Sequence, residues 1–340
     1  MGSNCGVLSC AVRMESAIMT YLAKAAAQVE GAQAFDVFCT PGLSCLRTPD
    51  HELLTQRARY HLCSTEPRRI RTSAYEIQTY TYWPNTKPVA SVLLVHGWTG
   101  EAAFMGAFAE RLRRAGYRAV IMDMPAHGQS EGQEATLFDC AQAIVDVAEV
   151  LGGVDFALGH SIGAMALLTA GEGRYPLRNA YPFQAYVLVA MPDAISDVTR
   201  KFGAGLGLSP AAQRVFERRL EVLARRRIAD FSGTTLLAAT GRPTLLIHAR
   251  DDAEVPFVCA RNMVQAAPNV HLQAVDGGGH RAILYAPPAI RAAVTFLDAQ
   301  PRPMVDGGHD AVPPRAWQSR HSNTTLNTRP NDAHHRFDER

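Results

Sequence analysis

Residues 154–170, VDFALGHSIGAMALLTA, form the stretch of the chain that decides its fold. A short apolar run leads into the pentapeptide GHSIG (159–163), and an alanine-rich apolar segment follows at once. This order predicts a buried strand, a very tight turn with Ser161 at its apex, and a helix. Glycines two residues before and after the serine leave room for a bend that a Cβ atom would obstruct. The Ser161 hydroxyl is therefore expected at a helix N-terminus, where free N–H groups favour developing negative charge.

A second pentapeptide, GQSEG (128–132), has the same spacing in a different context. It follows a Pro-Ala-His sequence instead of a strand, and a polar stretch comes after it in place of an apolar helix. We interpret Ser130 as part of a turn, because the strand–turn–helix context that supports a nucleophile surrounds only Ser161.

The size and composition of the chain exclude several classes of protein. Its 340 residues are 47% hydrophobic with a formal net charge of +2, which is typical of a globular protein and does not indicate a nucleic-acid partner. An apolar run of about 18 residues, as a transmembrane helix requires, is missing, and the N-terminus does not resemble a signal peptide. The seven cysteines fit no metal-ligand spacing. We therefore expect a cytoplasmic protein with reduced thiols and with no metal or other cofactor; nothing in the sequence indicates its oligomeric state.

Strand and helix patterns alternate from residue 74 to residue 299, which we predict to be one α/β domain. The predicted strands are residues 75–82, 91–95, 118–122, 154–158, 185–190, 244–248 and 270–275. The predicted helices are residues 104–115, 137–151 and 287–297. Continuous apolar strands separated by helices predict a mostly parallel central sheet with helices on both faces.

The N-terminal segment, residues 1–73, precedes this alternation. Residues 1–13 are predicted to be a loose leader, and residues 14–30 a helix that Gly31 ends. From there to residue 73 the sequence contains scattered prolines and cysteines and shows no periodicity, which indicates an irregular segment.

Two further segments depart from the alternation. Residues 192–242 combine a glycine-rich stretch with an amphipathic helix pattern that begins at Pro210, so we expect a small helical cap over the C-terminal edge of the sheet. Eight basic residues between 200 and 227 are interpreted as a solvated helix face, with a surface for anionic substrates, lipids or a partner as alternatives. Residues 300–340 are polar and aperiodic, which predicts a disordered tail.

Acidic and histidine residues follow later strands, at the sheet edge where the serine turn is also expected. Asp251 and Asp252 come after one predicted strand, and His280 follows the next in a glycine-rich loop. A serine hydroxyl attacks a carbonyl efficiently only when a base takes its proton and a third group orients that base. The order serine, acid, histidine therefore predicts a catalytic triad, for which Asp193, after an earlier strand, is a further candidate acid.

Two backbone N–H groups are predicted to stabilise the negative charge that such an attack creates. One belongs to Ile162, directly after the serine. The other is expected in the loop HGWTG (96–100), where Trp98 is the candidate. The Trp98 side chain is interpreted either as a wall of the acyl pocket or as core packing.

This ordered set of motifs resembles the α/β-hydrolase superfamily in its serine-nucleophile branch. The resemblance covers roughly residues 75–298 and rests on HGW (96–98), DMPAHGQS (123–130), the Ser161 turn, Asp252 with Val255-Pro256, and Gly279-His280. It implies the α/β-hydrolase fold, with Ser161 as nucleophile, Asp252 as acid and His280 as base. Asp252 is preferred to Asp251 because the family usually has its acid four residues before that proline. Ala164 replaces a glycine that many relatives have, and so small a residue is expected to do little harm.

By that resemblance the protein is expected to be a metal-free serine hydrolase that cleaves a carboxylic ester through an acyl-enzyme. The substrate would be a small-molecule or lipid-like ester. Thioesterase, lysophospholipase and C–C hydrolase activities use the same triad and stay open, as does a ligand-binding protein without turnover. His96 and His127 are interpreted as structural histidines, and His160 as pointing away from the attack site. The unpatterned cap and loops carry no signal for the acyl or alcohol group.

Overall fold

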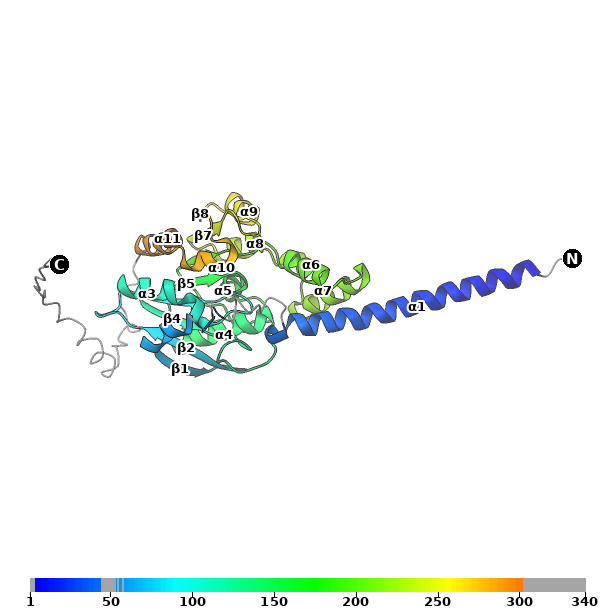
Figure 1. Ribbon diagram of the computed structural model, residues 1–340, viewed down its shortest axis with the longest axis horizontal. Helices are drawn as coiled ribbons and strands as arrows, with labels where there is room; N and C mark the ends of the chain where they lie inside the picture. Colours follow the sequence, from blue (N-terminus) through cyan, green and yellow to red (C-terminus); the bar gives the residue numbers. More distant parts are fainter. Residues whose placement is uncertain (1–3, 44–52, 54, 57, 302–340) are drawn as a thin grey trace, which may run out of the picture.

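An eight-stranded sheet lies at the centre of the computed structural model, which describes residues 4–43, 53, 55–56 and 58–301 (Figure 1). The strand order is β1-β2-β4-β3-β5-β6-β7-β8. The strands are β1 (Glu66–Arg71), β2 (Glu76–Tyr82), β3 (Ser91–Val95), β4 (Arg118–Met122), β5 (Phe156–His160), β6 (Ala185–Val189), β7 (Thr244–Ala249) and β8 (Val270–Val275). The strands β4, β3, β5, β6, β7 and β8 are parallel to one another. Strand β2 runs antiparallel to both β1 and β4. The predicted mostly parallel sheet is confirmed.

Helices cover both faces of this sheet. Successive residues of a strand point to opposite faces, so one strand contributes to two buried clusters. Along β3, Leu93 and Val95 belong to one buried cluster, whereas Val92 and Leu94 belong to the other. The first cluster lies under α4 (Leu137–Val150), α5 (Ile162–Glu172), α8 (Gly233–Thr240) and α9 (Val258–Ala266). The second lies under α3 (Gly106–Arg114) and α11 (Pro287–Asp298). Burial on both faces is why these strands read as continuous apolar runs.

The cap prediction corresponds to helices between β6 and β7. This segment forms α6 (Ile195–Gly205), α7 (Pro210–Ala224), the 3-10 turn η4 (Ile228–Asp230) and α8. Ser209 begins α7, because its side chain accepts a hydrogen bond from the Ala212 N–H and Pro210 occupies the first turn. We call α6 and α7 the cap helices. The predicted tail beyond residue 301 lies outside the described residues.

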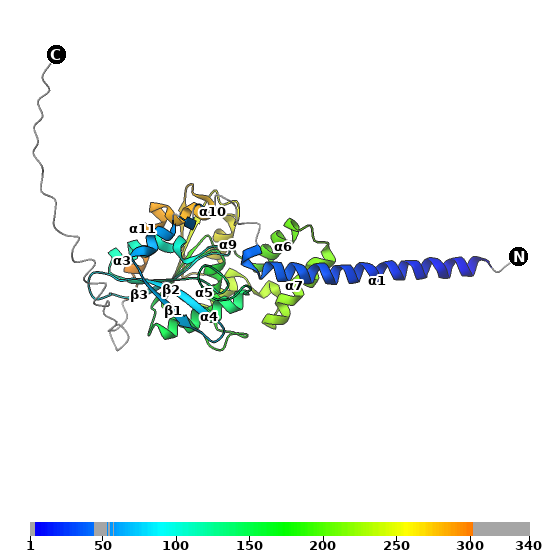
Figure 2. The same cartoon turned by 60° about the horizontal axis from the view of Figure 1, so that its bottom comes forward.

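The N-terminal helix α1 (Asn4–Phe38) is much longer than the sequence predicted. Its C-terminal half packs along α7, and its N-terminal half extends beyond the rest of the described structure (Figures 1 and 2). The prediction of a loose leader was wrong over residues 4–13, while residues 1–3 lie outside the described residues, and the predicted helix end at Gly31 was also wrong. Gly31 lies where the two helices touch, since a Cβ atom there would be 2.5 Å from the Ala212 carbonyl oxygen and 2.6 Å from Val215 Cβ. Its smallness permits close packing instead of ending the helix.

The prediction of an irregular segment up to residue 73 was wrong for its last part, which contains β1. This strand, EPRRIR, pairs with β2 on one side only, and Ile70 is its one buried residue. An edge strand with one apolar residue has no periodicity that distinguishes it from a loop.

In the part of the chain that the structure describes, no helix is both long and apolar enough to cross a membrane. Cys39, Cys63, Cys140 and Cys259 are free thiols, and the cytoplasmic location stays a prediction.

The close α1–α7 contact predicts an unusual response to substitution of Gly31. Glycine to alanine inside a helix normally stabilises a protein by about 0.5–1 kcal/mol. At Gly31 the added methyl group meets the α7 backbone, so we expect Gly31→Ala to lower the free energy of unfolding by about 1–3 kcal/mol. Urea denaturation followed by circular dichroism measures this change. Gly205→Ala at the end of α6 is the control, because a Cβ there meets nothing within 4 Å. Equal stabilisation by both substitutions would contradict the close packing.

Candidate active site

Ser161 lies in the turn between β5 and α5, in a backbone conformation that side chains rarely adopt. Its φ is 51° and its ψ is −121°, a combination whose cost for a non-glycine residue is of order 1–3 kcal/mol. The turn is held by a hydrogen bond of 2.9 Å from the Ser161 N–H to the Val189 carbonyl. A Cβ at Gly159 would lie 2.6 Å from the Ala164 Cα, and one at Gly163 would overlap the His96 carbonyl oxygen. Both glycines of the pentapeptide are therefore required by the packing around the serine.

The structure brings Ser161, His280 and Asp252 into one hydrogen-bonded chain. His280 Nε2 lies 3.0 Å from Ser161 Oγ, and His280 Nδ1 lies 2.9 Å from Asp252 Oδ2. The serine comes from the β5–α5 turn, the acid from the β7–α9 loop, and the histidine from the short helix α10 (Gly279–Ala282). All three residues are buried, with 6–9% of their surface exposed. This arrangement can pass a proton from the hydroxyl to the imidazole while the carboxylate orients the ring.

The surroundings of Asp252 keep its carboxylate ionised. Burial alone would raise its pKa, but hydrogen bonding with His248 and His280 outweighs burial and holds the pKa well below its ordinary value. His248 Nε2 lies 3.4 Å from Asp252 Oδ2. The N–H groups of Glu254 and Val255 donate to Asp252 Oδ1 at 2.9 and 2.8 Å. The carboxylate is therefore charged at neutral pH and fixed from both sides.

The two alternative acids lie elsewhere. The Asp251 side chain is exposed and accepts a hydrogen bond of 3.1 Å from the Gly279 N–H, so it braces the loop that carries His280. Asp193 lines the cavity beyond β6, where burial raises the pKa of its carboxyl group and its hydrogen bonds involve Asn262 and Thr234. Of the three acids, Asp252 is the one whose carboxylate contacts the His280 ring.

His96, His127 and Ser130 hold loops together, which agrees with their interpretation from the sequence as structural residues. The N–H of Met124 donates to His96 Nε2 at 3.0 Å, and burial, the largest influence, lowers the His96 pKa well below its ordinary value. His127 Nε2 accepts from the Thr99 N–H at 3.2 Å. Ser130 Oγ donates to the Asp123 carbonyl at 2.8 Å within a turn.

His160 has a position that the sequence interpretation missed. Its ring lies against the His280 ring, with centroids 4.9 Å apart, instead of pointing away from the site. Burial and the neighbouring His280 lower the His160 pKa to about 3, so its ring is neutral. Its Nε2–H then donates to the His280 carbonyl oxygen at 2.9 Å. His160 therefore positions the backbone of His280, a contact between residues 120 positions apart that no local pattern indicates.

Ile162 directly follows the serine, and the N–H groups of Ile162 and Trp98 lack acceptors among the described residues. Ile162 is the first residue of α5, where the helix leaves its N–H groups free. The 96–98 loop passes directly beside the turn, since a Cβ at Gly97 would lie 3.2 Å from Ser161 Cβ and 2.6 Å from His160 Nδ1. Both Trp98 and Ile162 line the cavity that opens over Ser161.

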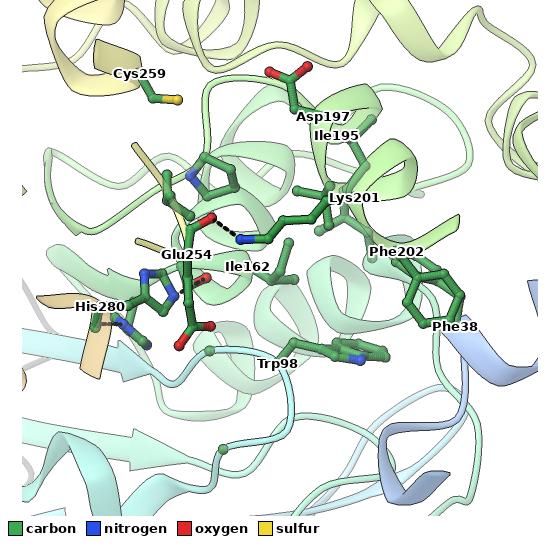
Figure 3. Close-up of a pocket in the computed structure, with 18 of the residues that line it drawn as sticks. Phe38, Trp98, Ile162, Ile195, Asp197, Lys201, Phe202, Glu254, Cys259 and His280 are labelled. Carbon is green, nitrogen blue, oxygen red and sulfur yellow. Dashed lines mark hydrogen bonds between the residues drawn. The ribbon is translucent and has the colours of Figure 1, made fainter. Parts of the chain in front are cut away.

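This cavity has a volume of about 790 Å³ and a largely apolar lining (Figure 3). Its walls come from the end of α1, the loop after β3, the cap helices and the segment after His280. Apolar members of the lining include Val37, Phe38, Trp98, Ile195, Val198, Phe202, Leu206, Leu220, Leu284 and Tyr285. The Trp98 side chain is thus part of the wall. The contribution of α1 was missed, because the residues after Gly31 showed no periodicity in the sequence.

Known proteins resemble this chain in sequence and in fold. The sequence model of the Alpha/beta hydrolase family matches residues 92–294. A monoacylglycerol lipase from Mycolicibacterium smegmatis is 25% identical over 241 residues, 59% of this chain and 85% of the relative. A putative carbamate hydrolase, RutD, from Pseudomonas savastanoi pv. phaseolicola is 40% identical over 74 residues, which are 22% of this chain and 29% of that protein. The structure of Est1E from Butyrivibrio proteoclasticus with bound ferulic acid is 20% identical, with a TM-score of 0.58 over 68% of this chain and 98% of Est1E.

The protein belongs to the α/β-hydrolase family, because the family match covers more than half of its length. The predicted fold is confirmed by the sheet, by this match and by the fold of Est1E. Membership in this family, with relatives named as a lipase and as a carbamate hydrolase, makes the protein a hydrolase.

Proposed function

We propose that the protein is a serine hydrolase that cleaves carboxylic esters with a lipid-like acyl group. The observation that carries the proposal is the position of His280, whose ring nitrogens lie 3.0 Å from Ser161 Oγ and 2.9 Å from Asp252 Oδ2. The proposed chemistry belongs to the domain predicted over residues 74–299 with a cap at 192–242. The sheet itself extends back to Glu66 through β1, and the cap helices α6 and α7 end at Ala224. The nucleophile, the base and the oxyanion donors all come from the chain, so the reaction needs no metal or other cofactor. The cytoplasm stays the proposed location, on the sequence argument of scattered cysteines.

The reaction proceeds in two halves. His280 Nε2 removes the proton from Ser161 Oγ as that oxygen attacks the ester carbonyl, and Asp252 stabilises the imidazolium. The tetrahedral oxyanion accepts hydrogen bonds from the N–H groups of Trp98 and Ile162. His280 then gives the proton to the leaving alcohol, and the C–O bond breaks to leave an acyl-enzyme on Ser161. A water molecule attacks this acyl-enzyme with His280 as base, which releases the acid and restores the serine.

The cavity supports an apolar acyl group as the substrate feature that is recognised. A large, largely apolar space next to Ser161 fits a hydrocarbon chain better than a small polar carbamate. The similarity to a monoacylglycerol lipase supports the same substrate class. A thioester of such a chain would fit the same space, so thioesters belong in any substrate screen.

Covalent labelling tests the proposed nucleophile. A fluorophosphonate probe should react with the wild-type protein, and peptide mapping by mass spectrometry should find the adduct on Ser161. Ser130 is an internal control, because it has the same pentapeptide spacing but its hydroxyl is engaged with the Asp123 carbonyl. Absence of labelling together with absence of ester hydrolysis would overturn the proposal, as would an adduct on a different serine.

A further inference from the structure

The end of α1 contributes Phe38 to the cavity wall on the side away from His280 (Figure 3). Phe38, the last residue of α1, stacks on the Trp98 ring with a centroid distance of 6.2 Å and an interplanar angle of 18°. It also meets Phe202 and Phe216 of the cap helices edge-on, with centroids 5.1 and 5.2 Å away. One ring thus joins the loop of the proposed oxyanion donor to the cap.

Phe38 is held in this place by contacts on both of its sides in sequence. Before it, Ala34 is buried in a small cluster with Phe216 and Leu220 of α7. After it, the Cys39 carbonyl accepts a hydrogen bond of 2.8 Å from the Ala135 N–H, which ties the end of α1 to the segment before α4. The Phe38 ring is therefore a fixed wall of the cavity.

This wall comes from outside the part of the chain that matches the family. The match begins at residue 92, so α1 and Phe38 lie outside it. In Figure 3 the Trp98 ring lies between His280 and the Phe38 and Phe202 rings, so a hydrocarbon chain that runs from the His280 side along Trp98 meets those two rings. Atoms beyond such a wall stay in water and contribute no binding energy.

We propose that Phe38 sets the length of the acyl chain that the site accepts, and that the preferred substrates are esters of unbranched medium- to long-chain acids. The inference rests on the proposed function. Each methylene group that the cavity buries raises kcat/KM by about fourfold, so the optimum lies at the chain length that just reaches Phe38. α1 is by this reasoning part of the substrate site.

A series of p-nitrophenyl esters from acetate to palmitate tests this role. Phe38→Ala should shift the optimum by at least two carbons toward longer chains and raise the ratio of kcat/KM for palmitate to that for butyrate by about tenfold or more. Phe38→Trp should shift the optimum toward shorter chains. Phe35→Ala is the matched control, because Phe35 lies one turn earlier on α1 and packs at the same contact with α7 but does not line the cavity. Its chain-length profile should equal that of the wild type.

A binding measurement separates this inference from the proposed function. Calorimetric titration of Ser161→Ala with octanoate, laurate and palmitate should show the same shift when Phe38→Ala is added. A wild type that hydrolyses none of the esters overturns the proposed function, and the titration then decides the role of Phe38 alone. If the esters are hydrolysed but Phe38→Ala and Phe35→Ala have the same profile as the wild type, Phe38 does not set chain length and the inference is wrong.

Discussion

Replacement of Ser161 by alanine should lower kcat for an activated ester by about four orders of magnitude or more, the largest effect expected for any single substitution. The reason is that His280 Nε2, 3.0 Å from Ser161 Oγ, then has no hydroxyl to deprotonate. The cavity and the N–H groups of Trp98 and Ile162 are unchanged, so residual turnover reports what they contribute without a nucleophile. The hydrolysis of p-nitrophenyl butyrate under saturating conditions measures the loss.

Ser161→Gly is a second variant that separates the loss of the nucleophile from the strain of the backbone. It is expected to be equally inactive but more stable than the wild type by about 1–3 kcal/mol, because glycine adopts a φ of 51° and a ψ of −121° without strain. Alanine keeps most of that strain, so the two variants separate chemistry from backbone energetics. An alanine variant that keeps one hundredth or more of the wild-type kcat would show that another residue is the nucleophile.

The strands could be predicted well because their signal is local. The runs 91–95 and 118–122 were predicted with the bounds that β3 and β4 have, since strands buried along their whole length are largely apolar segments between turns. The edge strand β1 has no such run, and only its pairing with β2 makes it a strand. Elements defined by a partner far away in sequence are those that periodicity does not find.

The difference between a local signal and a contact with a distant segment also explains which site residues could be predicted from the sequence. Ser161, Asp252 and His280 each follow a predicted strand, and parallel strands bring their C-terminal ends to one edge of the sheet, so their approach followed from topology. His160 and Phe38 act through tertiary contacts, one with a backbone carbonyl and the other with rings of three different segments. Their residue types are compatible with ordinary packing, and no spacing marks them.

Asp252→Asn should reduce kcat by about four orders of magnitude, whereas Asp251→Asn and Asp193→Asn should change it little. An ionised carboxylate at position 252 accepts the His280 Nδ1–H and so leaves Nε2 free to take the serine proton. An asparagine amide can donate to Nδ1, which favours the opposite tautomer, in which Nε2 carries its own hydrogen and cannot act as a base. Asp251 meets only the backbone of the histidine loop, and an asparagine side chain still accepts that N–H.

The comparison among these three variants identifies the acid. Steady-state kinetics should be measured well below the unfolding temperature of each variant, because Asp252→Asn also weakens the hydrogen bonds from the Glu254 and Val255 N–H groups, at about 1–3 kcal/mol. Circular dichroism on the same samples shows whether they are folded.

Since hydrogen bonds hold the Asp252 pKa well below its ordinary value, the carboxylate stays ionised through the neutral range and into mildly acidic solution. The factor between wild type and Asp252→Asn should therefore be large at every pH in that range. A loss of similar size in Asp193→Asn, with Asp252→Asn near wild type, would move the acid to the end of β6.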